Sequence, residues 1–135
     1  KYHAYVNEHP TENVLNDNVV MSACRLARDT HADAIIGITT SGYTAFRLSH
    51  HRPKASLFIC TTNRQLMNTL ALYWGVYVLP FIPDEAKNAD ETVREIKQKL
   101  IERGDLKTGD IYINVLSMPM SKHRKTNTVR LSVAE

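Results

Sequence analysis

Short apolar runs alternate with segments of helical spacing along this chain, and this alternation limits the fold more than any other feature. The expected strands are residues 34–38, 56–60, 76–79 and 110–116. The expected helices are residues 16–29, 44–50, 63–73 and 88–103, of which the last is the longest. Because parallel strands need a crossover segment between them, this alternation indicates a parallel sheet covered on both faces.

The last segment of the chain follows a different pattern. In residues 128–133, Val129, Leu131 and Val133 alternate with polar side chains, which is typical of a strand with one solvated face. No crossover helix separates this segment from the strand before it, so we expect the two strands to be antiparallel. The predicted fold class is therefore α/β: a three-layer α/β/α sandwich with a mostly parallel five-stranded sheet whose last strand is antiparallel.

Length and composition exclude several classes of protein. At 135 residues the chain has the length of one domain, which we place at residues 18–135 after a polar lead-in segment at residues 1–17. The formal net charge of +3 is too small to indicate a nucleic-acid partner. No apolar stretch reaches the about 20 residues that a membrane span needs, so no membrane partner is expected either. The first residue is Lys1 rather than Met, which fits a fragment or a trimmed chain.

The two cysteines indicate the redox environment. Cys24 and Cys60 lie in apolar surroundings, and no C-x-x-C motif is present. We therefore expect two buried reduced thiols, which are common in cytoplasmic proteins.

Residues 39–44, which we call the hydroxyl turn, join the first expected strand to a helix. The turn consists of Thr39, Thr40, Ser41, Gly42, Tyr43 and Thr44. Hydroxyl groups and backbone N–H groups at a helix N-terminus favour an anion, typically a phosphate, and ligands of parallel sheets bind at the carboxyl ends of the strands. The motifs of P-loops and of dinucleotide-binding folds are both absent. A helix start capped by Ser or Thr, without a ligand, is the alternative interpretation.

Residues 118–125, which we call the basic loop, carry Lys122, Arg124 and Lys125 without an acidic residue, and Arg130 follows nearby. Solvated surface charge explains many such segments. The alternative is an electropositive flap over the hydroxyl turn, since Arg and Lys bind phosphate well.

No arrangement of residues indicates catalysis or a metal site. His50 and His51 are adjacent, so on a helix they point about 100° apart and cannot share a metal ion on one face. The chain contains no H-E-x-x-H motif, no Ser–His–Asp or Cys–His arrangement that we can nominate, and no acidic cluster for Mg²⁺. We therefore expect neither catalytic residues nor metal ligands in this chain.

Six motifs follow one another between about residue 18 and the end of the chain. They are the strand and turn at residues 35–44, the segment 47–53 that ends in Arg-Pro, the strand and Thr-x-Asn start at residues 56–63, Leu72-Tyr73-Trp74-Gly75-Val76, Gly109-Asp110, and Thr126-Asn127-Thr128. In these motifs and their order the chain resembles the C-terminal domain of pyruvate kinase. The resemblance implies the same three-layer fold with an antiparallel last strand.

The resemblance also implies a function. In this family the C-terminal domain performs no chemistry and needs no cofactor of its own. Phosphate is transferred between phosphoenolpyruvate and ADP on a separate domain, with Mg²⁺ and K⁺. The C-terminal domain binds a phosphorylated sugar or nucleotide effector at the loop that residues 39–44 match. It also contributes to subunit contacts in a cytoplasmic homotetramer, here through residues 128–133 and the helix at 88–103.

Two departures from the family pattern concern the effector. The Trp and Arg that hold a second phosphate are unmatched: residues 83–88 contain no Trp, and Thr92 lies where the Arg aligns. The glycine-rich effector loop is here the basic loop, which contains no glycine. These differences disfavour fructose 1,6-bisphosphate and leave glucose 6-phosphate, AMP or no effector as alternatives. We hypothesise that Lys122, Arg124 and Lys125 replace the missing Arg.

Two further functions remain open at this point. The first is a structural interaction domain that has lost its effector site, which the absence of any bound phosphometabolite would favour. The second is a stand-alone protein that binds a phosphorylated metabolite, which a reading frame beginning near Lys1 would favour.

Overall fold

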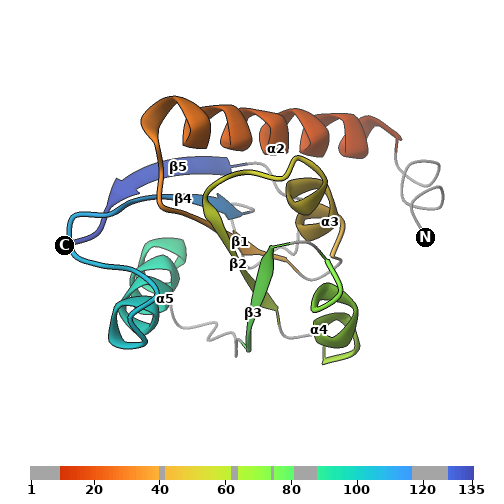
Figure 1. Cartoon of the computed structure of the whole chain (residues 1–135). Helices are drawn as coiled ribbons and strands as arrows, with labels where there is room; N and C mark the ends of the chain where they lie inside the picture. The colour runs from red at the N-terminus through yellow and green to blue at the C-terminus, as the bar shows by residue number, and fades with distance from the viewer. Residues whose placement is uncertain (1–9, 40–41, 62–63, 74, 81–87, 117–127) are drawn as a thin grey trace.

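A mixed five-stranded sheet with strand order β3-β2-β1-β4-β5 forms the centre of the fold (Figure 1). The computed structural model describes residues 10–39, 42–61, 64–73, 75–80, 88–116 and 128–135. The elements are α2 (Pro10–Thr30), β1 (Ala34–Ile38), α3 (Tyr43–His50), β2 (Ser56–Thr61), α4 (Arg64–Leu70), β3 (Val76–Pro80), α5 (Ala89–Glu102), β4 (Ile111–Leu116) and β5 (Thr128–Val133).

The strand pairing confirms the predicted sheet. β1 pairs in parallel with β2 on one side and with β4 on the other, and β2 pairs in parallel with β3. β5 is antiparallel to β4, with Tyr112 opposite Ser132. The carboxyl ends of four parallel strands therefore share one edge of the sheet, and their amino ends share the other.

Each face of the sheet has its own apolar core. One core lies under α2, α3 and α4, where Ile35, Ile59 and Ile113 pack against α2 residues such as Val20 and Ala23. The other core lies under α5 and consists of Ala34, Ile36, Phe58, Cys60, Leu79, Ile96, Leu100, Leu106, Tyr112 and Ala134. Full burial of one large aliphatic side chain contributes about 1.5–3 kcal/mol. Strands that are buried on both faces explain why the sequence shows them as continuous apolar runs.

The prediction that the longest helix is the one near residues 88–103 is wrong. α2 has 21 residues and begins at Pro10, well before the expected start at residue 16, whereas α5 has 14. Proline is favoured in the first turn of a helix, because the N–H group that it lacks has no partner there. α5 itself begins as expected, with a capping box in which Asn88 accepts from the Glu91 N–H group.

The expected burial pattern is also wrong at two places. On the edge strand β5, Leu131 and Val133 are 46% and 54% exposed, whereas Val129 on the same side of the strand packs against the core under α2. Cys60 is buried as expected, but Cys24 is only half-buried; both thiols are free. Burial raises the pKa of the Cys24 thiol to about 11 and that of Cys60 to about 12, so both stay protonated at neutral pH.

In the part of the chain that the structure describes, no helix combines the length and the apolar character that a membrane span requires.

Candidate functional site

The hydroxyl turn lies at the carboxyl edge of the sheet, as predicted. β1 and β4 are neighbours, and Gly37 pairs with Val115 close to the ends of both strands. The hydroxyl turn and the segment that contains the basic loop therefore begin side by side. Thr40 and Ser41, together with the basic-loop residues Lys122, Arg124 and Lys125, fall outside the described residues.

Thr39 closes the turn from within. Its N–H group donates to the Cys60 carbonyl at 3.1 Å, which continues the β1–β2 ladder by one residue. Its Oγ1 accepts a hydrogen bond from the Gly42 N–H group at 3.2 Å. Gly42 has a φ of 83°, and a Cβ atom there would lie 2.5 Å from Leu66 Cδ1. The positive φ therefore favours glycine at this position, and any larger residue would also displace the Leu66 side chain.

The last two residues of the turn are anchored to α2. The Tyr43 hydroxyl donates to Asp17 Oδ1 at 2.6 Å, and Asp17 also pairs with the Arg47 guanidinium at 3.2 Å. Thr44 Oγ1 accepts from Asn16 Nδ2 at 3.1 Å. Tyr43 and Thr44 are almost completely buried. The hydroxyl groups of Thr39, Tyr43 and Thr44 therefore hold the turn in place and position the N-terminus of α3.

The sequence analysis missed the α2 residues that hold this turn. Asn16 occupies the same helical stripe as Val20, Ala23 and Ala27, and it is 1% exposed. A polar residue on the apolar stripe of a helix is the signal that could have identified it, because a buried amide needs hydrogen-bond partners.

The N-terminus of α3 has the electrostatic character expected of an anion site. Its N-cap is Gly42, so no side chain caps the helix, and its first turn contains no acidic residue. The positive end of the helix macrodipole therefore has no acidic residue to balance it within that turn. Thr40 and Ser41, the other two hydroxyl residues that were predicted to bind the anion, lie outside the described residues.

A second polar group lies on the α5 side of the sheet. Asn114 on β4 is 1% exposed, and neither polar atom of its side chain has a hydrogen-bond partner. Arg130, opposite Asn114 on β5, forms an ion pair with Asp90 near the start of α5. The positive charge of Arg130 is thus balanced locally, which weakens the expectation that it adds to the charge of the basic loop. Asn114 is the single polar residue in the run Ile111–Leu116, a signal that the sequence analysis did not use.

No group of three or more His, Cys, Asp or Glu side chains in the described ranges is placed to hold a metal ion.

Comparison with known proteins places these features in a family. The family described as "Pyruvate kinase, alpha/beta domain" matches residues 17–132. A pyruvate kinase of Clostridium acetobutylicum is 32% identical over 120 residues, covering 89% of this chain and 25% of the relative. A pyruvate kinase of Lactobacillus delbrueckii subsp. bulgaricus is 30% identical over 133 residues, covering 98% of this chain and 21% of the relative.

A plant relative matches over a shorter range. The chloroplastic pyruvate kinase isozyme A of Nicotiana tabacum is 31% identical over 109 residues, covering 79% of this chain and 18% of the relative. The chain thus spans roughly a fifth to a quarter of the length of these relatives. With the family match across nearly all of its residues, this chain belongs to the pyruvate kinase alpha/beta domain family, the C-terminal domain of pyruvate kinases.

Proposed function

We propose that this chain is the regulatory and oligomerising domain of a cytoplasmic pyruvate kinase. In the whole enzyme, phosphate passes between phosphoenolpyruvate and ADP with Mg²⁺ and K⁺. The residues that do this chemistry lie outside this chain, so the chain alone is inactive. The family match and the small share of each relative that the chain spans support this proposal.

In this proposal a phosphorylated effector binds at the hydroxyl turn. The observation that carries it is the N-terminus of α3, which follows β1 at the carboxyl edge without a capping side chain or an acidic first turn. A phosphate there gains from the macrodipole and from the hydroxyl groups of Thr40 and Ser41. Thr39, Gly42, Tyr43 and Thr44 belong to the site because they shape the turn.

The basic loop supplies positive charge to the same site. Lys122, Arg124 and Lys125 follow β4, which is the neighbour of β1 in the sheet. Arg130 pairs with Asp90, so these three residues are the better candidates for a second contact with the effector. The effector classes that fit best are a sugar monophosphate and a nucleoside monophosphate, since the Trp and Arg that hold a second phosphate in the family are unmatched in this chain.

Regulation requires that the effector binds one quaternary state more tightly than another. We place the contact between copies at β5, the edge strand at which Leu131 and Val133 are exposed, with α5 contributing as expected from the resemblance. An exposed apolar edge strand pairs readily with its own copy across a two-fold axis. The assembly proposed for the whole enzyme is a homotetramer.

A thermal-shift titration tests the effector site. The chain is titrated with glucose 6-phosphate, AMP, ribose 5-phosphate and fructose 1,6-bisphosphate, each up to high excess. A ligand at a hundredfold excess over its Kd stabilises the fold by about 2.7 kcal/mol, which raises the Tm visibly. The variant is Thr40→Ala with Ser41→Ala, because Thr44 accepts a buried bond from Asn16 and its loss would also weaken the fold.

The matched control is Ser22→Ala, which removes an exposed hydroxyl from α2. We expect one compound to stabilise the wild-type and control proteins and not the double variant. If no compound raises the Tm, the effector proposal fails. The structural interaction domain, favoured by the exposed apolar residues of β5, then becomes the better account.

A further inference from the structure

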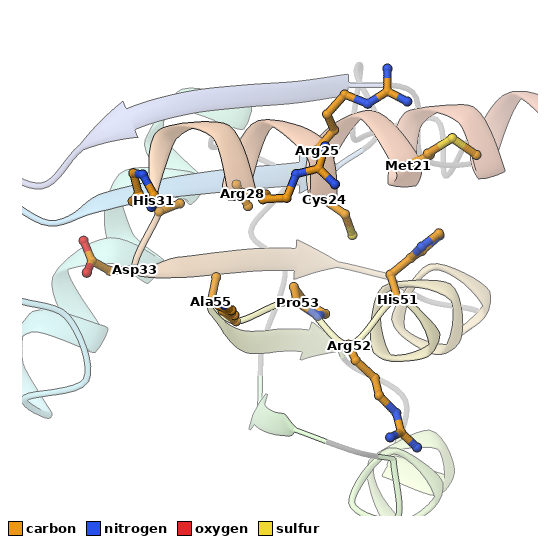
Figure 2. A pocket seen from close by; sticks show the side chains of 13 residues that line it. Met21, Cys24, Arg25, Arg28, His31, Asp33, His51, Arg52, Pro53 and Ala55 are labelled. Carbon is orange, nitrogen blue, oxygen red and sulfur yellow. The ribbon is translucent and has the colours of Figure 1, made fainter.

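A pocket of about 680 Å³ lies at the amino edge of the sheet, between the end of α2 and the segment that joins α3 to β2 (Figure 2). Because β1 has five residues at about 3.3 Å each, this edge is about 17 Å from the hydroxyl turn. The residues that line it are Met21, Cys24, Arg25, Ala27, Arg28, His31, Ala32, Asp33, His51, Arg52, Pro53, Lys54 and Ala55. We call this cavity the basic pocket.

Positive charge is concentrated in the basic pocket. Its lining has four Arg or Lys side chains and one carboxylate, that of Asp33, which gives a formal charge of +3. This equals the net charge of the whole chain. One oxygen of the Asp33 carboxylate, Oδ2, accepts a hydrogen bond from the Ile111 N–H group at 3.0 Å.

The neighbouring charges that the structure describes offset this charge only in part. Outside the lining, Asp29 pairs with Arg28 at 3.5 Å, but both side chains are exposed and such pairs are weak. The C-termini of α2 and α3 also point at the pocket, and each contributes roughly half a negative charge. A formal charge of +3 exceeds that contribution. One basic residue per helix end would suffice to balance the macrodipoles, so the pocket keeps a net positive charge that can attract an anion.

The backbone at the basic pocket gives an independent argument. Among the described residues, the two non-glycine residues with positive φ are His31, at 54°, and Arg52, at 47°, and both line the pocket. Each ends a helix: His31 N–H donates to the Arg28 carbonyl, and Arg52 N–H donates to the Ser49 carbonyl. Glycine is the residue that adopts this left-handed conformation without strain. Strained positions of this kind concentrate at functional sites.

Figure 2 shows how the basic side chains surround the pocket. Arg28 and His31 lie on the α2 side, and His51 lies at the end of α3. The side chains of Arg25 and Arg52 extend outwards at opposite rims. Arg25 is exposed, so its long side chain can turn towards a ligand. Apolar surface from Ala27, Ala32, Pro53 and Ala55 is available inside the same cavity.

We propose that the basic pocket binds a small organic molecule with two or more phosphate groups. Arg side chains favour phosphate because their planar groups bind it through two hydrogen bonds, and the volume is in the range of small-molecule sites. The apolar part of the lining contacts the organic part of the ligand. This second site is independent of the hydroxyl turn, and either can fail without the other.

The first experiment follows the backbone amides of the full ¹⁵N-labelled chain by NMR during titration with inorganic pyrophosphate, with orthophosphate as the comparison. We expect saturable shifts at residues 28–33 and 51–55, and at least tenfold tighter binding of pyrophosphate than of orthophosphate. Shifts confined to residues 42–46 would assign the anion to the hydroxyl turn and overturn the proposal. The absence of any saturable shift would also overturn the proposal. This holds even if the reason is that an acidic surface of another copy fills the pocket.

Two variants locate the binding charges. Arg25→Gln with Arg28→Gln removes two exposed charges from the pocket. Arg94→Gln with Lys97→Gln removes the same charge from α5, on the other face of the sheet. The first pair should weaken pyrophosphate binding at least tenfold, and the second should leave it unchanged. Equal losses in the two pairs would show non-specific attraction and contradict the proposal.

Arg52→Gly separates binding from stability. It removes a basic side chain and relieves the strained backbone at the same position. We expect weaker pyrophosphate binding together with an unchanged or higher Tm. Unchanged binding, with the Tm maintained, would remove Arg52 from the site.

Discussion

The two edges of the sheet differ in the groups that they offer to an anion. At the carboxyl edge, the described hydroxyl groups of Thr39, Tyr43 and Thr44 are buried and hydrogen-bonded within the protein. At the amino edge, the basic side chains of the basic pocket are mostly exposed, and two backbone positions are strained. The carboxyl edge thus offers a preformed helix N-terminus, and the amino edge offers side-chain charge. Residue type alone does not distinguish a group that binds a ligand from one that holds the loop around it.

The largest expected effect concerns the backbone of the hydroxyl turn. Gly42→Ala should lower the free energy of unfolding by about 2–3 kcal/mol, because alanine resists the positive φ and its Cβ would displace the Leu66 side chain. Gly104→Ala is the control: its φ is 81°, but no atom lies within 4 Å of the added Cβ, so about 1 kcal/mol is expected. Urea denaturation measures both. Equal losses would show that Leu66 does not fix the turn.

The next effect tests the anchor between the turn and α2. Tyr43→Phe removes the hydroxyl that donates to Asp17 and should cost about 2 kcal/mol, as expected for a bond to a charged acceptor. Tyr77→Phe changes a residue that is 58% exposed and should leave stability unchanged. If Tyr43→Phe is equally silent in urea denaturation, the bond from Tyr43 to Asp17 does not hold the turn and the contrast between the two edges fails.

A double-mutant cycle tests the second anchor. Thr44→Val leaves the Asn16 amide without the acceptor it has at 3.1 Å, and about 1 kcal/mol of stability should be lost. In the background of Asn16→Leu the same change should have little effect, so the coupling free energy is about 1 kcal/mol. A coupling near zero would mean that this bond does not stabilise the turn.

The smallest effect has the opposite sign and concerns the amino edge. His31→Gly should raise the free energy of unfolding by up to about 1 kcal/mol, because glycine adopts the left-handed conformation freely. His50→Gly, at the last residue of α3, should lower it by up to about 1 kcal/mol, because glycine is a poor helix former and the stacking of His50 on Phe46 is lost. Thermal unfolding distinguishes the two. If His31→Gly destabilises the protein, His31 is retained for stability rather than for binding.

Much of the fold could be predicted from the sequence because burial on both faces makes the central strands continuous apolar runs. The antiparallel β5 followed from the absence of a crossover helix before it. The early start of α2 at Pro10 was missed because the first residues are polar and carry a proline. The exposure of Leu131 and Val133 depends on what covers an edge strand, which local alternation does not encode.

The candidate sites were less predictable, for a physical reason. The position of the hydroxyl turn follows from local sequence, but the bonds from Asn16 and Asp17 depend on how α2 packs beside α3. The basic pocket combines residues from two segments, 21–33 and 51–55, and neither segment alone contains a recognisable motif. Such sites appear only when the fold brings distant residues together.

The central claim is that a phosphorylated effector binds at the hydroxyl turn, and the most direct test is to locate the bound effector by NMR. In an NMR titration of the full chain with whichever monophosphate, glucose 6-phosphate, ribose 5-phosphate or AMP, raises the Tm, the account predicts amide shifts at residues 42–46, the start of α3, and none at residues 28–33 or 51–55. The Thr40→Ala, Ser41→Ala variant should lose those shifts. Shifts at the amino edge alone, or shifts at the start of α3 that persist in the variant, would contradict the assignment of the hydroxyl turn as the effector site.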